Sequence, residues 1–244
     1  MINTPAALLE DAQDSVQYLV YAIHVLSAQA PGGKVPVFTW SLGGVLMQWA
    51  FTFYPSVRSQ VKNFFALAPD FRGANFAFIS NNPLIGEPAL YQQAPVSNYL
   101  AAFLKAGGPT TAYVPTTVQY STTDEIVQPE TGPNASSVLG GNSRLVSNLL
   151  DQDICGSNYT YGHFTGLSHA LTASIFKQHL TQNSPVRIEQ VDTSKCNQTC
   201  NTPTVSTDDC AKAPGIPEFL GNYFAARAKF PIVLTEPAVR AYAQ

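Results

Sequence analysis

Apolar residues along the first two thirds of the chain follow two different periods. Short runs rich in β-branched and aromatic residues predict four strands, at residues 35–39, 61–70, 116–125 and 147–154. Apolar positions recur at helical spacing from Gly43 to just before Pro55, and again over residues 97–108, where Ser97 is the expected N-cap. Strands that alternate with helices predict an α/β fold, with a mostly parallel sheet covered on both faces.

The first 30 residues predict one amphipathic helix. Thr4 and Pro5 are its expected N-cap and first helical residue, and its apolar stripe consists of Val16, Leu19, Val20, Ile23 and Leu26. We expect no signal peptide in this chain, because the segment lacks a basic start and a compact apolar core and carries three acidic residues, Glu10, Asp11 and Asp14.

Two segments interrupt the alternation of strands and helices. Residues 71–96 are irregular and rich in Phe, Ile, Leu and Pro; they either cap an apolar pocket above the sheet or pack as a long loop, and the sequence leaves both open. Residues 185–244 are rich in loops, with one helix expected at 216–230. A chain of 244 residues is long enough for one large core, so we expect a single domain.

Composition narrows the classes of partner. Charged residues make up 12% of the chain, the net charge is −3, and no run of Lys or Arg occurs. These features argue against nucleic acid as a partner. No apolar segment approaches the roughly 18 residues that cross a bilayer, so contact with a lipid interface would be transient and without a transmembrane segment.

Cysteines and glycosylation sequons point to a secretory history. Four cysteines allow three disulfide pairings among Cys155, Cys196, Cys200 and Cys210. A zinc site is disfavoured, because no histidine lies near the last three of them. Three Asn-x-Ser/Thr sequons begin at Asn134, Asn158 and Asn197. This history conflicts with the lack of a signal peptide in the chain itself.

One serine stands where the first predicted strand turns into a helix, in the stretch VPVFTWSLGG. A sharp strand-to-helix turn lifts the side chain of Ser41 above the sheet edge and aims the next backbone N–H into the same space. Gly43 fits the crowded turn, whereas Thr39 replaces the glycine that is usual on the other side. Ser41 is therefore a candidate nucleophile, the alternative being an ordinary helix N-cap.

A serine nucleophile needs a base and an acid later in the chain. Of the four histidines, His163 follows the fourth predicted strand in a loop, which suits a general base. Asp124 follows the third predicted strand and is the favoured acid. Asp70 and Glu125 remain open as alternatives, and each of the three could instead cap a loop.

Three segments of the chain, residues 35–73, 114–129 and 154–172, resemble the fungal lipase B family, the Candida antarctica lipase B type of α/β-hydrolase. The resemblance is strong over residues 34–180, which it marks as the catalytic core. It implies the roles of nucleophile, acid and base for Ser41, Asp124 and His163.

The same resemblance implies further site residues. Trp40 would line the alcohol side of the pocket, Asp70 and Gln93 the acyl side, and the Leu42 backbone N–H would be one oxyanion donor. A disulfide between Cys155 and Cys196 is implied as well, and the pairing of the two remaining cysteines, Cys200 and Cys210, with each other is a guess.

Members of the family have strands, and a loop with further oxyanion donors, ahead of the segment that corresponds to the start of this chain. We therefore expect an N-terminally truncated α/β-hydrolase, read from an internal methionine of a longer, secreted protein.

The expected function is hydrolysis of carboxylic esters of lipids or other apolar substrates through an acyl-enzyme, as in a triacylglycerol lipase or esterase, or transacylation by the same site. We expect a monomer that needs no metal and no cofactor. The alternative is an inactive or binding-only remnant with an incomplete oxyanion hole.

Overall fold

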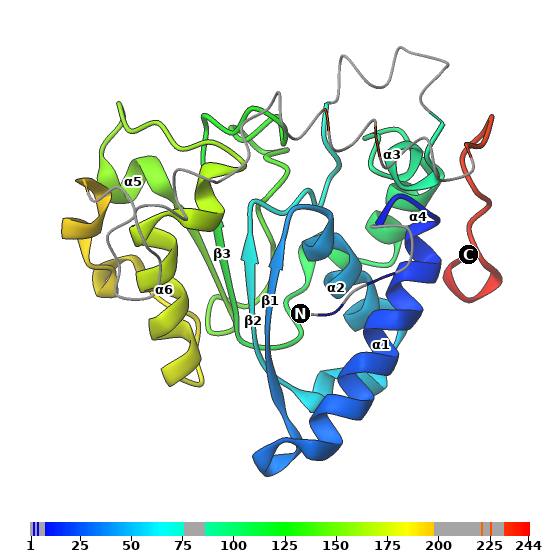
Figure 1. Ribbon diagram of the computed structural model, residues 1–244, viewed down its shortest axis with the longest axis horizontal. Helices are drawn as coiled ribbons and strands as arrows, with labels where there is room; N and C mark the ends of the chain where they lie inside the picture. The colour runs from blue at the N-terminus through cyan, green and yellow to red at the C-terminus, as the bar shows by residue number, and fades with distance from the viewer. Residues whose placement is uncertain are drawn as a thin grey trace.

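A computed structural model of the chain describes residues 8–75, 86–197 and 232–244, together with residues 2, 4, 221 and 225. Its centre is a parallel sheet of four strands in the order β1-β2-β3-β4 (Figure 1). The strands are β1 Val35–Trp40, β2 Val61–Leu67, β3 Thr116–Tyr120 and β4 Val146–Leu150. The predicted parallel α/β arrangement is confirmed.

Strand β2 shows why the sheet must be covered on both faces. Phe64 and Ala66 belong to one apolar cluster, whereas Phe65 and Leu67 belong to a second cluster on the opposite face. All four side chains are buried. Because successive residues of a strand point to opposite faces, this run of apolar residues requires two layers of helices.

The first cluster lies under α1 (Ala12–Gln29), α2 (Leu42–Phe53) and α4 (Asn98–Lys105). Trp49 of α2 stacks on Tyr99 of α4, with ring centroids 3.9 Å apart. Burial of large aromatic side chains of this kind dominates core stability. Figure 1 shows α1 and α2 together on one side of the sheet.

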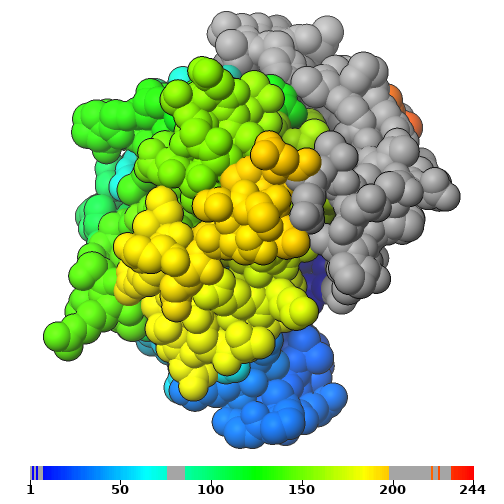
Figure 2. Space-filling model, turned by 90° about the vertical axis from the view of Figure 1, so that its left-hand side faces the viewer, coloured from blue at the N-terminus to red at the C-terminus, as the bar shows by residue number. Residues whose placement is uncertain are grey.

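The second cluster lies under α6 (Ala170–Thr181), which covers the opposite face of the sheet (Figure 1). In the view of Figure 2, α6 and the segment that follows it form the yellow part of the surface that faces the viewer. Short helices complete the described chain: α3 at Pro88–Gln92 and α5 at Asp151–Cys155. Short 3-10 helices occur at Pro31–Gly33, Pro55–Gln60, Gly108–Thr110, Thr165–Ser168, Ile188–Gln190, Thr193–Asn197 and Ala241–Ala243.

The start of the first helix differs from the prediction. Helix α1 begins at Ala12, and its N-cap is Asp11, whose side chain accepts from the Gln13 backbone N–H at 2.9 Å. The prediction of Thr4 as the N-cap was wrong because the helix begins later in the chain. Asp11 accepts there from a backbone N–H group that has no partner within the helix. The predicted stripe is buried at Val16, Val20 and Ile23, but Leu26 is 46% exposed.

The second and third strands end earlier than predicted, at Leu67 and Tyr120, and the fourth strand is also shorter than predicted. It ends at Leu150, where its pairing with β3 ends, and residues 151–155 form α5 instead of continuing the strand. Asp151 is buried there and accepts from the Gln119 amide at 2.8 Å. This contact between neighbouring strand ends stabilises the turn into a helix, and no local pattern in the sequence reveals it. The helix expected at 216–230 lies largely outside the described residues.

Candidate active site

Ser41 occupies the sharp turn between β1 and α2. Its backbone φ is 55° and ψ is −132°, a conformation that costs a non-glycine residue free energy. The turn is held by a hydrogen bond from the Ser41 N–H to the Leu67 carbonyl of β2, 2.9 Å long. Backbone strain of this kind is the geometry of a nucleophile elbow, which exposes a serine hydroxyl above the end of a parallel sheet.

Close approach requires a glycine at residue 44 and leaves little room for a side chain at residue 43. A Cβ atom on Gly44 would lie 2.5 Å from the Pro69 Cβ, which is a clash, and one on Gly43 would lie 3.3 Å from the Thr39 Cβ. Thr39 thus occupies the space that the more usual glycine leaves open, and the turn accommodates it because residue 43 has no side chain. The sequence-based interpretation of this pattern agrees with the geometry.

His163 and Asp124 form a buried hydrogen-bonded pair. The His163 Nδ1 lies 2.7 Å from the Asp124 Oδ2, and each residue is 4% exposed. The other carboxylate oxygen of Asp124 accepts from the backbone N–H groups of Ile126 and Val127, at 2.8 and 2.7 Å. Three hydrogen bonds therefore fix this carboxylate against the imidazole ring, in the manner of an acid that orients a general base.

The two alternative acids occupy different positions. Glu125 accepts from the backbone N–H of His163 at 2.7 Å and so contacts the main chain of the base, not its ring. Asp70 is fully buried, and neither of its carboxylate oxygens has a hydrogen-bond partner among the described residues. Burial raises the pKa of Asp70 to about 7. Of the three carboxylates, the structure brings only Asp124 to the imidazole.

Trp40 connects the nucleophile turn to the histidine loop. Its indole N–H donates to the His163 carbonyl at 3.1 Å, and its ring centroid lies 4.9 Å from the imidazole centroid. Ser41 follows Trp40 directly, so these contacts bring the serine turn to the histidine. Within the described part of the chain no hydrogen bond joins the Ser41 hydroxyl to His163, and such bonds often tighten only when substrate is bound.

Two other histidines have structural contacts. His169 is the N-cap of α6, with its Nδ1 accepting from the Leu171 N–H at 3.2 Å. His179 is buried, with its Nδ1 3.0 Å from the Thr117 hydroxyl, and burial lowers its pKa to about 4. The first contact caps α6, and the second joins α6 to β3 of the sheet.

The remaining predicted pocket residues lie near the end of β2. The backbone carbonyl of Asp70 accepts from the Gly73 N–H at 2.8 Å, and a Cβ on Gly73 would lie 2.5 Å from the Gln93 carbonyl. The two ends of segment 71–96 thus meet next to Asp70, while residues 76–85 lie outside the described chain. Leu42 is the first residue of α2, so its backbone N–H has no carbonyl one turn earlier to bind.

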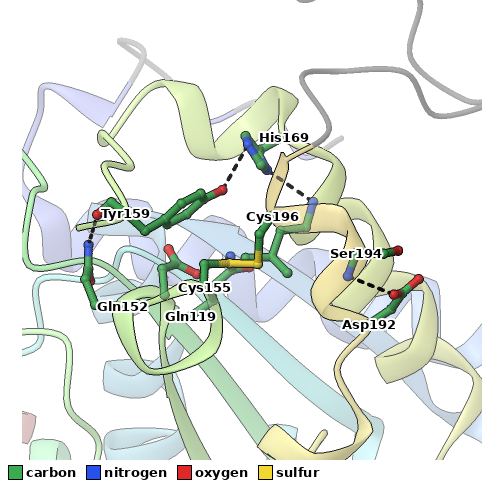
Figure 3. Close-up of a disulfide and its surroundings, with 10 residues drawn as sticks. Gln119, Gln152, Cys155, Tyr159, His169, Asp192, Ser194 and Cys196 are labelled. Atoms are coloured by element: carbon green, nitrogen blue, oxygen red, sulfur yellow. Dashed lines mark hydrogen bonds between the residues drawn. A yellow bond between two sulfur atoms is a disulfide. The ribbon is translucent and has the colours of Figure 1, made fainter. Parts of the chain in front are cut away.

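The structure confirms one predicted disulfide, between Cys155 and Cys196 (Figure 3). Cys200 and Cys210 lie outside the described residues. The sequon residues Asn134, Asn158 and Asn197 are all exposed. Over residues 8–75, 86–197 and 232–244, no group of three His, Cys, Asp or Glu side chains could hold a metal ion, and no helix is long and apolar enough to span a membrane.

Sequence reasoning missed two buried polar residues close to the pair. Glu130 accepts from the Ser137 backbone N–H at 3.1 Å, and burial raises its pKa to about 8. Gln152 is 9% exposed and contacts the loops of both Asp124 and His163. The only local evidence for a role of Gln152 is that it lies three residues before Cys155, in a stretch whose sequence predicts a strand.

Two proteins named lipase B are among the known proteins that this chain resembles. The chain is 39% identical over 169 residues to lipase B of Pseudozyma antarctica, a match that covers 68% of this chain and 48% of that protein. Its structure resembles the crystal structure of Aspergillus fumigatus lipase B with a TM-score of 0.83 and 32% identity, covering 98% of this chain and 58% of that chain. No family model matches.

The chain thus spans about half the length of the curated relative that it matches. Both comparisons agree with the resemblance found in the sequence, and the structural match extends over nearly all of this chain. The chain therefore belongs to the fungal lipase B family and has its α/β-hydrolase fold.

Proposed function

We propose that this chain is a serine hydrolase that cleaves carboxylic esters of lipids or other apolar alcohols and acids. The relatives that it resembles are both named lipase B. The observation that carries the proposal is the buried pair of Asp124 and His163, 2.7 Å apart, next to a serine held at positive φ. An ordinary helix N-cap requires neither feature.

In the proposed reaction, the Ser41 oxygen attacks the ester carbonyl while His163 Nε2 takes the hydroxyl proton. The carbonyl oxygen becomes an oxyanion, for which the backbone N–H of Leu42 is one donor. Collapse breaks the bond to the alcohol, which receives the proton from His163, and leaves an acyl-enzyme on the serine. Asp124 stabilises the imidazolium throughout.

Water then repeats the sequence and releases the acid. It gives a proton to His163, attacks the acyl carbonyl, and the serine oxygen leaves and recovers that proton. An alcohol in place of water gives transacylation by the same steps. Trp40, Asp70 and Gln93 are the proposed walls of the pocket, since they lie beside the histidine and at the end of β2.

The direct test is labelling of the purified 244-residue chain with a fluorophosphonate, which phosphonylates an activated serine. The chain is first shown to unfold cooperatively, and the Ser41→Ala variant is labelled in parallel. Stoichiometric labelling that the variant lacks would support the proposal. A folded chain that takes no label would contradict it and favour the binding-only alternative. Hydrolysis of a soluble short-chain ester and of an emulsified triacylglycerol then separates an esterase from a lipase.

We also propose that the protein acts outside the cell as a glycosylated monomer. The disulfide and the exposed sequon residues Asn134, Asn158 and Asn197 support secretion and glycosylation. Expression through a fungal secretory pathway should give protein whose mass falls on treatment with an N-glycosidase. An unchanged mass would contradict glycosylation. Light scattering gives the mass of the particle in solution and so tests whether the protein is a monomer.

A further inference from the structure

The loops that carry Asp124 and His163 are joined by a glutamine from a third element. Gln152 projects from α5 and lies between them. Its side-chain oxygen accepts from the Thr122 backbone N–H at 3.0 Å, and its amide nitrogen donates to the Tyr159 carbonyl at 2.8 Å. Figure 3 shows Gln152 reaching Tyr159 from this helix.

We propose that Gln152 is a positioning residue for the reaction, which sets the distance and orientation of His163 relative to Asp124. The inference rests on the proposed function of these two residues. Gln152 does not touch the imidazole or the carboxylate. It acts through the main chain of the two loops, which have no sheet pairing to each other.

The contacts on both sides require a carboxamide at this position. Thr122 presents a backbone N–H, which needs an acceptor, and Tyr159 presents a carbonyl, which needs a donor. Through its second hydrogen, the amide nitrogen of Gln152 donates to the Ser121 hydroxyl oxygen at 2.9 Å. A glutamate could accept from the N–H but would set a carboxylate against the carbonyl. Gln152 is buried, so an unmade hydrogen bond here is not replaced by water.

Gln152 also begins a chain of hydrogen bonds that crosses between the loops a second time. The Ser121 oxygen accepts from Gln152 and from the Thr123 N–H, so its own hydrogen is directed to the Thr123 hydroxyl, 2.9 Å away. The Thr123 oxygen in turn accepts from the Tyr161 N–H at 2.8 Å. Tyr161 precedes His163 by two residues, so the network ends in the main chain just before the base.

The helix that carries Gln152 is itself fixed at both ends. At its start, Asp151 accepts from Gln119 of β3 at 2.8 Å. At its end, Cys155 is bonded to Cys196 (Figure 3). A five-residue helix has little stability of its own, so these two anchors hold the glutamine in place. The sheet and the disulfide are thereby coupled to the geometry of the acid and base.

The test compares Gln152→Glu with Gln48→Ala. Gln48 on α2 is also fully buried and donates to two backbone carbonyls, at 2.8 and 2.6 Å, but contacts neither loop. We measure kcat and KM for a soluble short-chain ester, thermal unfolding, and the low-field ¹H NMR resonance of the His163 Nδ1–H, which reports its hydrogen bond to Asp124.

We expect Gln152→Glu to lower kcat about 10- to 100-fold with little change in KM, because misplacement of a catalytic group by about 1 Å costs up to about 100-fold. The low-field resonance should broaden or disappear. Gln48→Ala should unfold at a lower temperature and keep both kcat and the resonance. If Gln152→Glu does not fold, Ser121→Ala removes the next link and should weaken the resonance in the same way.

The inference is overturned if Gln152→Glu, or Ser121→Ala in its place, behaves like Gln48→Ala, with lower stability but an unchanged resonance and kcat. Failure of the proposed function has a different signature. In that case the wild-type chain takes no fluorophosphonate label, and the resonance alone still decides whether Gln152 positions the pair: its loss in the variant supports the inference, and its persistence overturns it.

Discussion

The indole N–H of Trp40 donates to the carbonyl of His163, 3.1 Å away, across 123 residues of sequence. One partner directly precedes the proposed nucleophile and the other is the proposed base. A carbonyl left unpaired in a partly buried site costs about 1–3 kcal/mol. The relative position of serine and histidine therefore depends on a side chain that takes no part in the chemistry.

Replacing Trp40 by phenylalanine tests this connection. Trp40→Phe retains an aromatic ring against the imidazole but removes the N–H donor. We expect the free energy of unfolding to fall by about 1–2 kcal/mol, measured by urea denaturation, because the His163 carbonyl loses its partner. We also expect kcat to fall. A variant with wild-type stability and kcat would show that the hydrogen bond does not position the histidine.

Asp124→Asn should disable the base without unfolding the protein. The asparagine oxygen can still accept from the N–H groups of Ile126 and Val127, which leaves its NH₂ group facing His163 Nδ1. Nδ1 must then accept, so the ring proton moves to Nε2, which can no longer take the serine proton. We expect kcat to fall about 10⁴-fold with near-normal thermal unfolding.

The neighbouring carboxylate provides the matched control for that variant. Glu125→Gln keeps an oxygen that can accept from the His163 backbone N–H. We expect it to lower kcat far less than the change at Asp124. An equal loss in the two variants would contradict the assignment of Asp124 as the orienting acid and would restore the glutamate as an alternative.

Buried carboxyl groups should make the protein less stable at alkaline pH. Burial raises the pKa values of Asp70, Glu130 and Asp151 to about 7, 8 and 8. Between the unfolded pKa near 4 and these values, the unfolded chain releases protons that the folded chain keeps. The stability that these groups contribute is therefore full below about pH 4, falls as pH rises from about 4 to the folded pKa values, and levels off above about pH 8.

Asp151→Asn isolates one of these groups. The asparagine oxygen can still accept from Gln119 but does not titrate. We expect the loss of unfolding free energy between pH 5 and 8 to be smaller in the variant, by up to about 1.4 kcal/mol per pH unit. His179 has the opposite effect on the pH dependence of stability. Burial lowers its pKa to about 4, so the unfolded chain binds a proton that the folded chain does not, and the protein loses stability as pH falls from 6.5 to about 4. Identical pH profiles for wild type and variant would contradict burial of the charge.

Removal of the disulfide should lower stability and loosen α5. Cys155 and Cys196 are 41 residues apart in sequence, and a loop of that size is worth about 2–4 kcal/mol. The paired variant Cys155→Ser with Cys196→Ser should lose that much in urea denaturation. We expect its kcat to fall as well, because Gln152 lies on the same helix. Unchanged stability would show that the bond is not formed in solution.

Local patterns were sufficient for much of the fold. The strands from 35, 61 and 116 begin at the predicted residues, because local runs of β-branched and aromatic residues favour a strand. The ends of the second, third and fourth strands were predicted too late. At the fourth, Asp151 is buried and accepts a hydrogen bond from Gln119 at the end of another strand. The prediction was also wrong at Thr4, since two capping residues were available and the later one, Asp11, caps the helix.

The sequence by itself determined the parallel α/β sheet and the serine turn, because side-chain period, capping residues and small residues after Ser41 act within a few positions of the chain. The tertiary structure decided which carboxylate meets His163, how Cys155 pairs, and that Gln152 joins two loops. Each of these depends on contacts between segments some 30 to 40 residues apart, whose distance is fixed only when the strands assemble.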